Sequence, residues 1–172
     1  MFYTILKRFF LKKKIAKKLQ IQQPLLEQQK IVSIGILVDE SYFPNSEVLV
    51  AEIVKHGFKK EQIQVLVFKD KMKSKEVVSE PFLSLKNISI SGEINKAEVL
   101  AFLDEPFDLL LNYYDVSKYS LMLLSLKSKA NFKVGFDGVD KRINHFIIKE
   151  EVENYKEFTA ELFKYLKILN KI

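Results

Sequence analysis

The chain has 172 residues, a length that fits one domain, and 48% of them are apolar, enough for a core without disulfide or metal support. It contains no cysteine, which excludes disulfides, thiolate zinc sites and cysteine nucleophiles. No apolar run approaches the ~20 residues of a membrane span, and the N-terminus lacks the apolar core of a secretory signal. We therefore expect a cytoplasmic protein. The net charge is +6.

This charge is concentrated in residues 1–20. That segment contains no acidic residue and seven basic ones, namely Lys7, Arg8, Lys12, Lys13, Lys14, Lys17 and Lys18. The rest of the chain carries 21 of the 28 basic residues and all 22 acidic residues, so it is close to neutral. A basic arm on a neutral body indicates docking on a polyanion through one element, whereas a long nucleic-acid groove would make the body basic.

The spacing in residues 1–20 predicts an amphipathic helix. Its apolar positions lie between basic residues and are Phe2, Ile5, Leu6, Phe9, Phe10, Ala16 and Leu19. Residues 21–30, rich in glutamine and containing Pro24, predict a polar connector. Residues 31–172 are predicted to form a single domain.

Apolar runs and turn residues divide that domain into alternating strands and helices. The predicted strands are 31–39, 63–68, 107–114, 132–136 and 145–149, with 82–91 as a strand or hairpin at a sheet edge. Helices are predicted from Asn45 or Ser46 to His56, from Asn95 to Leu103, after Ser117, and near the C-terminus. This alternation predicts an α/β, Rossmann-like domain with a mainly parallel sheet of about five strands and helices on both faces.

Ligands of open α/β sheets bind beyond the carboxyl ends of the strands. The residues there that suit a small-ligand pocket are Asp39, Glu40, Asn112, Tyr114, Asp115 and Asp137. Their oxygens suit a hard cation, or one carboxylate could act as a base. Asp and Asn at strand ends also form turns and helix caps, and this structural interpretation is favoured.

Catalytic motifs are missing from the sequence. The loop "DESYFPNS" after the first predicted strand has no glycine, so it fits neither a dinucleotide fingerprint nor a P-loop. Neither His56 nor His145 has a recognisable catalytic partner. We therefore predict no catalytic residue, cofactor or metal, and a non-enzymatic role is favoured.

Three interpretations of the basic helix stay open. It could pack on its own domain with its lysines solvated, bind RNA through lysines and aromatic rings, or lie on an anionic membrane surface. The charged loop with Lys69, Lys71, Lys73 and Lys75 adds to the RNA interpretation. Our leading hypothesis is an accessory protein that docks through its basic helix on RNA or a ribonucleoprotein assembly such as the ribosome. The oligomeric state stays open.

Three segments carry a resemblance to a known family: "GILVDE" (35–40), "DLLLNYY" (108–114) and "KVGF" (133–136). With the basic start, they resemble a family of short, uncharacterised bacterial α/β proteins, a domain of unknown function. This resemblance implies a fold and no activity.

A second resemblance covers residues 107–138. Their strand, helix and "K-x-G-F" strand are similar to part of the amino domain of heptosyltransferase-type glycosyltransferases. It implies the same fold class and, as a further alternative, a degenerate glycosyltransferase-like domain. In those enzymes a second domain binds the sugar nucleotide, and we expect no such domain within these 172 residues.

Overall fold

The computed structural model describes residues 2–19, 29–70 and 80–172, and in the first helix it describes the side chains of Lys7 and of Phe9 onward. The helices are α1 (Phe2–Lys18), α2 (Ser46–Lys55), α3 (Ala97–Asp104), α4 (Tyr119–Lys127) and α5 (Tyr155–Ile168). The strands are β1 (Ile34–Asp39), β2 (Ile63–Lys69), β3 (Phe82–Ser84), β4 (Leu109–Tyr113), β5 (Phe132–Phe136) and β6 (Phe146–Ile148).

The six strands form one sheet in the order β3-β2-β1-β4-β5-β6, and every pair is parallel. The predicted α/β fold is therefore confirmed, with one strand more than the predicted number of about five. The segment 82–91 is β3 followed by a single turn of 3₁₀-helix and a short hairpin closed by a bridge between Ile88 and Ile94. The strand order reverses between β1 and β4, as at the switch point of a Rossmann fold.

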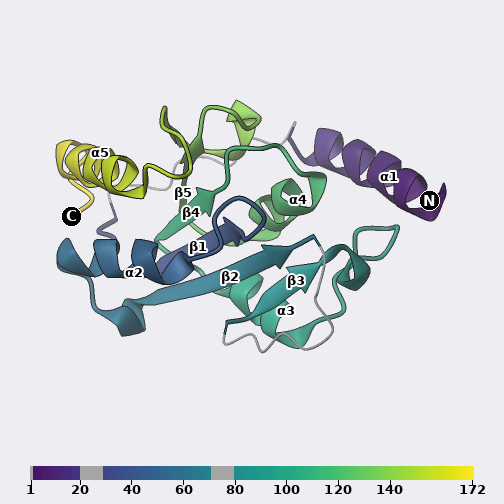
Figure 1. Cartoon of the computed structure of the whole chain (residues 1–172), viewed down its shortest axis with the longest axis horizontal. Coiled ribbons are helices and arrows are strands. Elements are labelled where there is room, and N and C mark those ends of the chain that lie inside the picture. Colours follow the sequence, from purple (N-terminus) through teal and green to yellow (C-terminus); the bar gives the residue numbers. More distant parts are fainter. Residues whose placement is uncertain (1, 20–28, 71–79) are drawn as a thin grey trace.

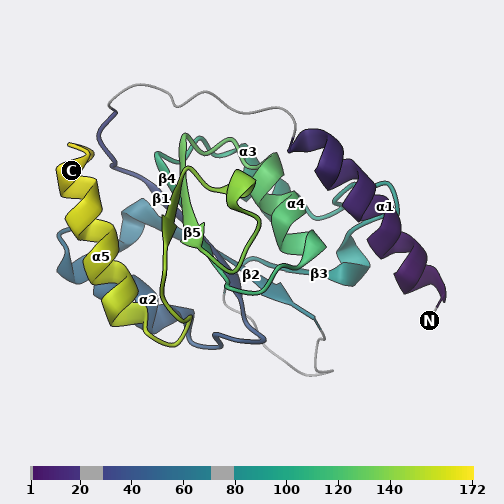
Figure 2. The same ribbon diagram turned by 90° about the horizontal axis from the view of Figure 1, so that it is seen from above.

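Helices cover both faces of the sheet. Viewed from above, α2 and α5 lie on one side of the strands and α4 lies on the other (Figure 2). Side chains alternate between these layers along each strand. In β1, Ile36 and Val38 belong to the core beneath α2 and α5, and Leu37 belongs to the core beneath α3 and α4.

Helix α1 adds an outer layer against α4, at the end of the molecule opposite α5 (Figures 1 and 2). Leu11, Ile15 and Leu19 recur every four residues, form one stripe of the helix, and are buried in the same core as α3 and α4. The basic helix therefore packs on its own domain. Phe9 and Phe10 are exposed, although the sequence grouped them with the apolar positions, because Phe9 lies about 200° around the helix from Leu11.

Three lysines of α1 also contact the domain. Lys7 Nζ donates to the Leu85 carbonyl, and Lys14 Nζ donates to the Ser91 carbonyl at 2.7 Å. Lys18 Nζ reaches the Leu126 carbonyl at 3.5 Å, at the end of α4. These three lysines lie along one border of the apolar stripe, so this face of α1 carries both apolar and polar contacts to the domain.

The turn 89–93 fits beneath α1 because it contains a glycine. Gly92 has φ +77°, a left-handed conformation that favours glycine. A Cβ there would also stand 3.2 Å from Lys14 Cδ and 3.4 Å from a methyl group of Leu11. The close approach of the turn to α1 thus depends on a small residue at this position.

We expect Leu11→Ala to lower the free energy of unfolding by about 2–4 kcal/mol, because it leaves a cavity under a fully buried side chain. Phe9→Ala, on the exposed side of the same helix, is the matched control and should change it by less than about 0.5 kcal/mol. Urea denaturation of the full chain measures both values. Equal values for the two variants would contradict the packing of α1 on α4.

Candidate functional site

An internal ion-pair cluster occupies the switch point between β1 and β4. Lys118, just before α4, places its Nζ 2.6 Å from Asp39 Oδ2 and 2.6 Å from Asp70 Oδ2. The same ammonium donates to Ser41 Oγ at 3.3 Å and lies 5.0 Å from the centre of the Tyr42 ring. Asp39 is buried at the end of β1. A protein cation therefore neutralises the carboxylates at the position where Rossmann folds bind ligands.

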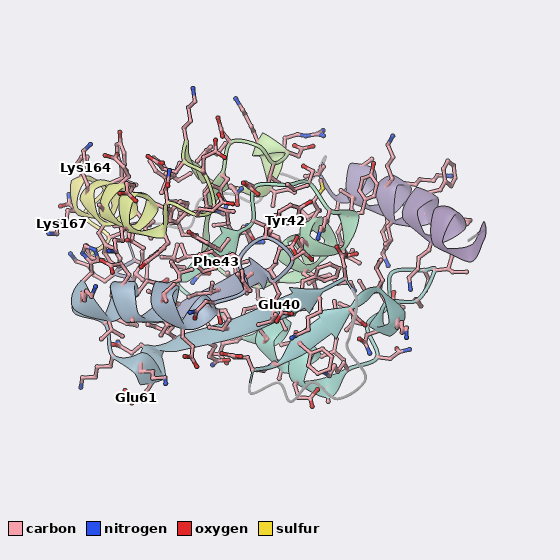
Figure 3. All side chains as sticks on the ribbon, viewed as in Figure 1. Glu40, Tyr42, Phe43, Glu61, Lys164 and Lys167 are labelled. Atoms are coloured by element: carbon pink, nitrogen blue, oxygen red, sulfur yellow. The ribbon has the colours of Figure 1, made fainter. Side chains whose placement is uncertain are left out.

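On the α2 side of this sheet edge, the described residues line a small cavity. Glu40 pairs with the buried Lys69 at 2.7 Å. A cavity of about 40 Å³ adjoins this pair, and its lining residues are Val38, Glu40, Phe43, Pro44, Ser46, Val67, Lys69 and Glu80. Glu40, Tyr42 and Phe43 lie around the loop between β1 and α2 (Figure 3). Ligand pockets measure about 300–1,000 Å³, so this cavity is too small for a nucleotide, and two carboxylates line it.

The other four predicted pocket residues lie at or just after the carboxyl ends of β4 and β5. Asn112 is buried toward α4 and donates to Ser125 Oγ at 2.9 Å and to Asn144 Oδ1 at 2.6 Å. Tyr114 is buried in the same layer, and this burial raises its pKa. The backbone oxygen of Asp115 packs so closely on Gly138 that a Cβ there would collide with it, and Asp137 is exposed.

The ion pairs and hydrogen bonds of the described residues do not join all six predicted residues in one network. Among the described residues, the Tyr114 N–H donates to the Asn112 carbonyl at 3.0 Å, no ion pair or side-chain hydrogen bond joins two of the six, and no group of three acidic or histidine side chains could hold a metal ion. Asp39 and Glu40, although adjacent, pair with different lysines on opposite faces of the sheet.

The buried Lys133 was missed by sequence reasoning. It lies on β5 with 3% of its surface exposed, and its Nζ donates to the carbonyls of Ser125 at 2.6 Å and Ser128 at 3.2 Å. Desolvation, and then the positive charge of Lys18, lower the pKa of Lys133 to about 8. The sequence feature that could have indicated this buried lysine is its position inside the apolar strand "FKVGF".

Lys133 should make stability depend on pH. Its pKa is about 8 in the folded chain and about 10.4 in the unfolded chain. The unfolded chain binds more protons between these values, so stability should rise with pH in that window and stay unaffected by this group below about pH 8. We expect the rise to be about 3 kcal/mol relative to Lys133→Met, measured by urea denaturation across the window. If the free energy of unfolding changed equally with pH in the wild type and in Lys133→Met, this account of Lys133 would be contradicted.

The outward face of α1 is the second candidate site. We use this name for Phe9, Phe10, Lys12, Lys13 and Lys17, which are exposed on this side of the helix together with Ala16. Phe9 is 63% exposed and Phe10 is 44% exposed, and their rings meet edge to face with centroids 5.9 Å apart. At 100° per residue, Phe9 lies between Lys12 and Lys13 around the helix, and Lys17 lies between Lys13 and Phe10.

Six of the seven basic residues predicted to bind a polyanion thus divide into two groups. Lys7, Lys14 and Lys18 contact the domain, and the lysines of the outward face point to solvent. The side chain of Arg8 lies outside the described residues, as do most of the predicted connector 21–30 and the loop lysines Lys71, Lys73 and Lys75.

None of the described helices combines the length and apolarity required to cross a membrane.

The fold and these sites define a Rossmann-like α/β protein with a basic helix packed on its surface. The chain belongs to a family of unknown function (DUF6913), whose model matches residues 7–169. The match begins within α1, so most of the docked helix belongs to the family region. No curated protein and no solved structure matched the chain. These comparisons therefore give no support to the glycosyltransferase resemblance of residues 107–138.

Proposed function

We propose that this protein is a non-enzymatic accessory protein that binds RNA through the outward face of α1, within a ribonucleoprotein assembly such as the ribosome. The observation that carries the proposal is the exposure of two phenylalanines among three lysines on a helix whose opposite face is anchored to the domain. The proposal implies a cytoplasmic location.

The side chains of the outward face are chemically complementary to RNA. Lysine ammonium groups bind phosphates and release counterions, which supplies binding without sequence readout. Exposed aromatic rings stack on unpaired bases of any sequence. Phe9 and Phe10 are perpendicular, with an interplanar angle of 83°, so they would stack on two bases that differ in orientation. Such bases occur in RNA loops and single strands, where bases are splayed apart.

Anchoring of α1 also favours binding. A basic segment that folds only on its target loses conformational entropy at that step. Here Leu11, Ile15 and Leu19 are already packed on the domain, so the lysines and rings are presented on an ordered helix. We therefore expect the full chain to bind RNA more tightly than a peptide of residues 1–19.

The outward face supports binding to an anionic membrane less well than binding to RNA. Binding of a helix in a membrane interface scales with the apolar area that it buries. The domain buries Leu11, Ile15 and Leu19, so these side chains are not available to a membrane. The large apolar side chains on the outward face are Phe9 and Phe10. The filled switch point, with Lys118 between Asp39 and Asp70, supports the non-enzymatic part of the proposal.

Replacing Lys12, Lys13 and Lys17 by glutamine should weaken binding to a single-stranded RNA by at least about tenfold at about 0.1 M salt. It should also reduce the slope of log K against log salt by about 2, because three phosphate contacts are lost. Fluorescence anisotropy with a labelled 20-nucleotide RNA of mixed sequence measures both quantities.

The matched control replaces three exposed lysines of α5, namely Lys156, Lys164 and Lys167, by glutamine. Lys164 and Lys167 lie at the end of the molecule opposite α1 (Figure 3), and the change in net charge is the same. Equal weakening in both variants would contradict a specific role for α1. Binding of the wild type to anionic vesicles without binding to RNA would favour the membrane alternative.

Phe9→Ala combined with Phe10→Ala should weaken RNA binding by roughly tenfold or more without changing the salt slope, because stacking is worth about 1–3 kcal/mol per base. Ile168→Ala combined with Leu169→Ala is the control, since these apolar side chains on and just after α5 are similarly exposed, at 65% and 41%. The same binding assay applies. Unchanged affinity of the phenylalanine variant would show that the rings do not contact bases.

A further inference from the structure

One carboxylate lies between lysines of the arm and of the domain, where α1 meets the end of α4. Glu93 Oε1 is 3.1 Å from Lys14 Nζ on α1, and Glu93 Oε2 is 4.0 Å from Lys127 Nζ on α4. Lys18 lies beside them, with its Nζ 3.5 Å from the Leu126 carbonyl. We call Lys14, Lys18, Lys127 and Glu93 the seam.

The electrostatics of the seam are dominated by positive charge. Desolvation, followed by the charges of Lys127 and Lys14, lowers the pKa of Lys18. The hydrogen bond from Lys14 and the charge of Lys127 lower the pKa of Glu93. Three ammonium groups thus surround a single carboxylate, and the seam has a net positive charge with Glu93 in place.

Glu93 is held only loosely in this position. Its side chain is 62% exposed, and ion pairs at such exposure contribute about 0–1 kcal/mol. The backbone of the turn is fixed separately, because Ser89 Oγ accepts a hydrogen bond from the Glu93 N–H at 2.9 Å. The carboxylate can therefore rotate into solvent while the turn and α1 keep their positions.

We propose that the seam is a phosphate-binding site that extends the RNA surface from α1 onto α4, and that Glu93 occupies it in the unbound protein. This inference rests on the proposed function. A phosphodiester is an oxyanion, as the Glu93 carboxylate is, so it can take the place of that carboxylate between Lys14 and Lys127. Lys127 then becomes an RNA contact outside the basic arm, and Glu93 becomes a residue that weakens binding by competing with RNA.

Glu93→Gln tests this competition directly. Glutamine keeps the size of the side chain and still accepts a hydrogen bond from Lys14, so the packing of α1 is preserved. We expect the variant to bind the single-stranded RNA about two- to fivefold more tightly than the wild type. The salt slope should become steeper by about 0.7 for each new phosphate contact.

Two further variants make the test specific. Glu61→Gln removes one exposed carboxylate far from α1 (Figure 3), and it should leave the affinity within about twofold of the wild type, because only the net charge changes. Adding Lys127→Gln to Glu93→Gln should abolish most of the gain in RNA affinity, because the proposed phosphate contact of Lys127 is then lost.

An equal gain in Glu61→Gln, or a gain that survives the loss of Lys127, would overturn the seam as a site. Unchanged affinity of Glu93→Gln would do the same, while RNA binding by the outward face would stand. If neither the wild type nor Glu93→Gln binds RNA, both proposals fall.

Discussion

The packing of one stripe of α1 against the domain determines how the rest of the helix can act. Leu11, Ile15 and Leu19 are buried with the core of α3 and α4. Because an α-helix advances 100° per residue, burial of that stripe turns Phe9 and Lys13 toward solvent. Lysines along one border of the stripe donate to backbone carbonyls of the domain. A uniformly basic segment is thereby divided into an anchored face and a face that is available for binding.

The sheet edge where Rossmann folds usually bind ligands differs from α1, because charged side chains there form ion pairs with one another. The carboxylates that follow β1 and β2 are paired with lysines, Asp39 and Asp70 with Lys118 and Glu40 with Lys69. A ligand would have to break these pairs and leave the buried Asp39 without its cation, which typically destabilises a protein by several kcal/mol. In the proposed function, the parallel sheet is the support of the basic helix, and RNA binds on α1 and at the seam.

Much of the fold was predictable, because buried parallel strands are near-continuous apolar runs; β5 was predicted with its observed bounds, 132–136. The site was less predictable. Periodicity showed that the arm was helical, but Phe9 and Leu11 are equally apolar, and only contacts from distant segments select which one is buried. Likewise, Glu93 and Lys14 are 79 positions apart, and no local pattern links them. The acidic strand ends were located correctly, yet their pairing with Lys118 depends on the three-dimensional arrangement.

The most direct test of this account is ultraviolet crosslinking of the full chain to single-stranded RNA, with the crosslinked peptides identified by mass spectrometry. The account predicts crosslinks on the outward face of α1, at Phe9 and Phe10 and the lysines beside them. Crosslinks confined to the loops after β1 and β4, near Tyr42 and Lys118, would contradict it and would place binding at the sheet edge.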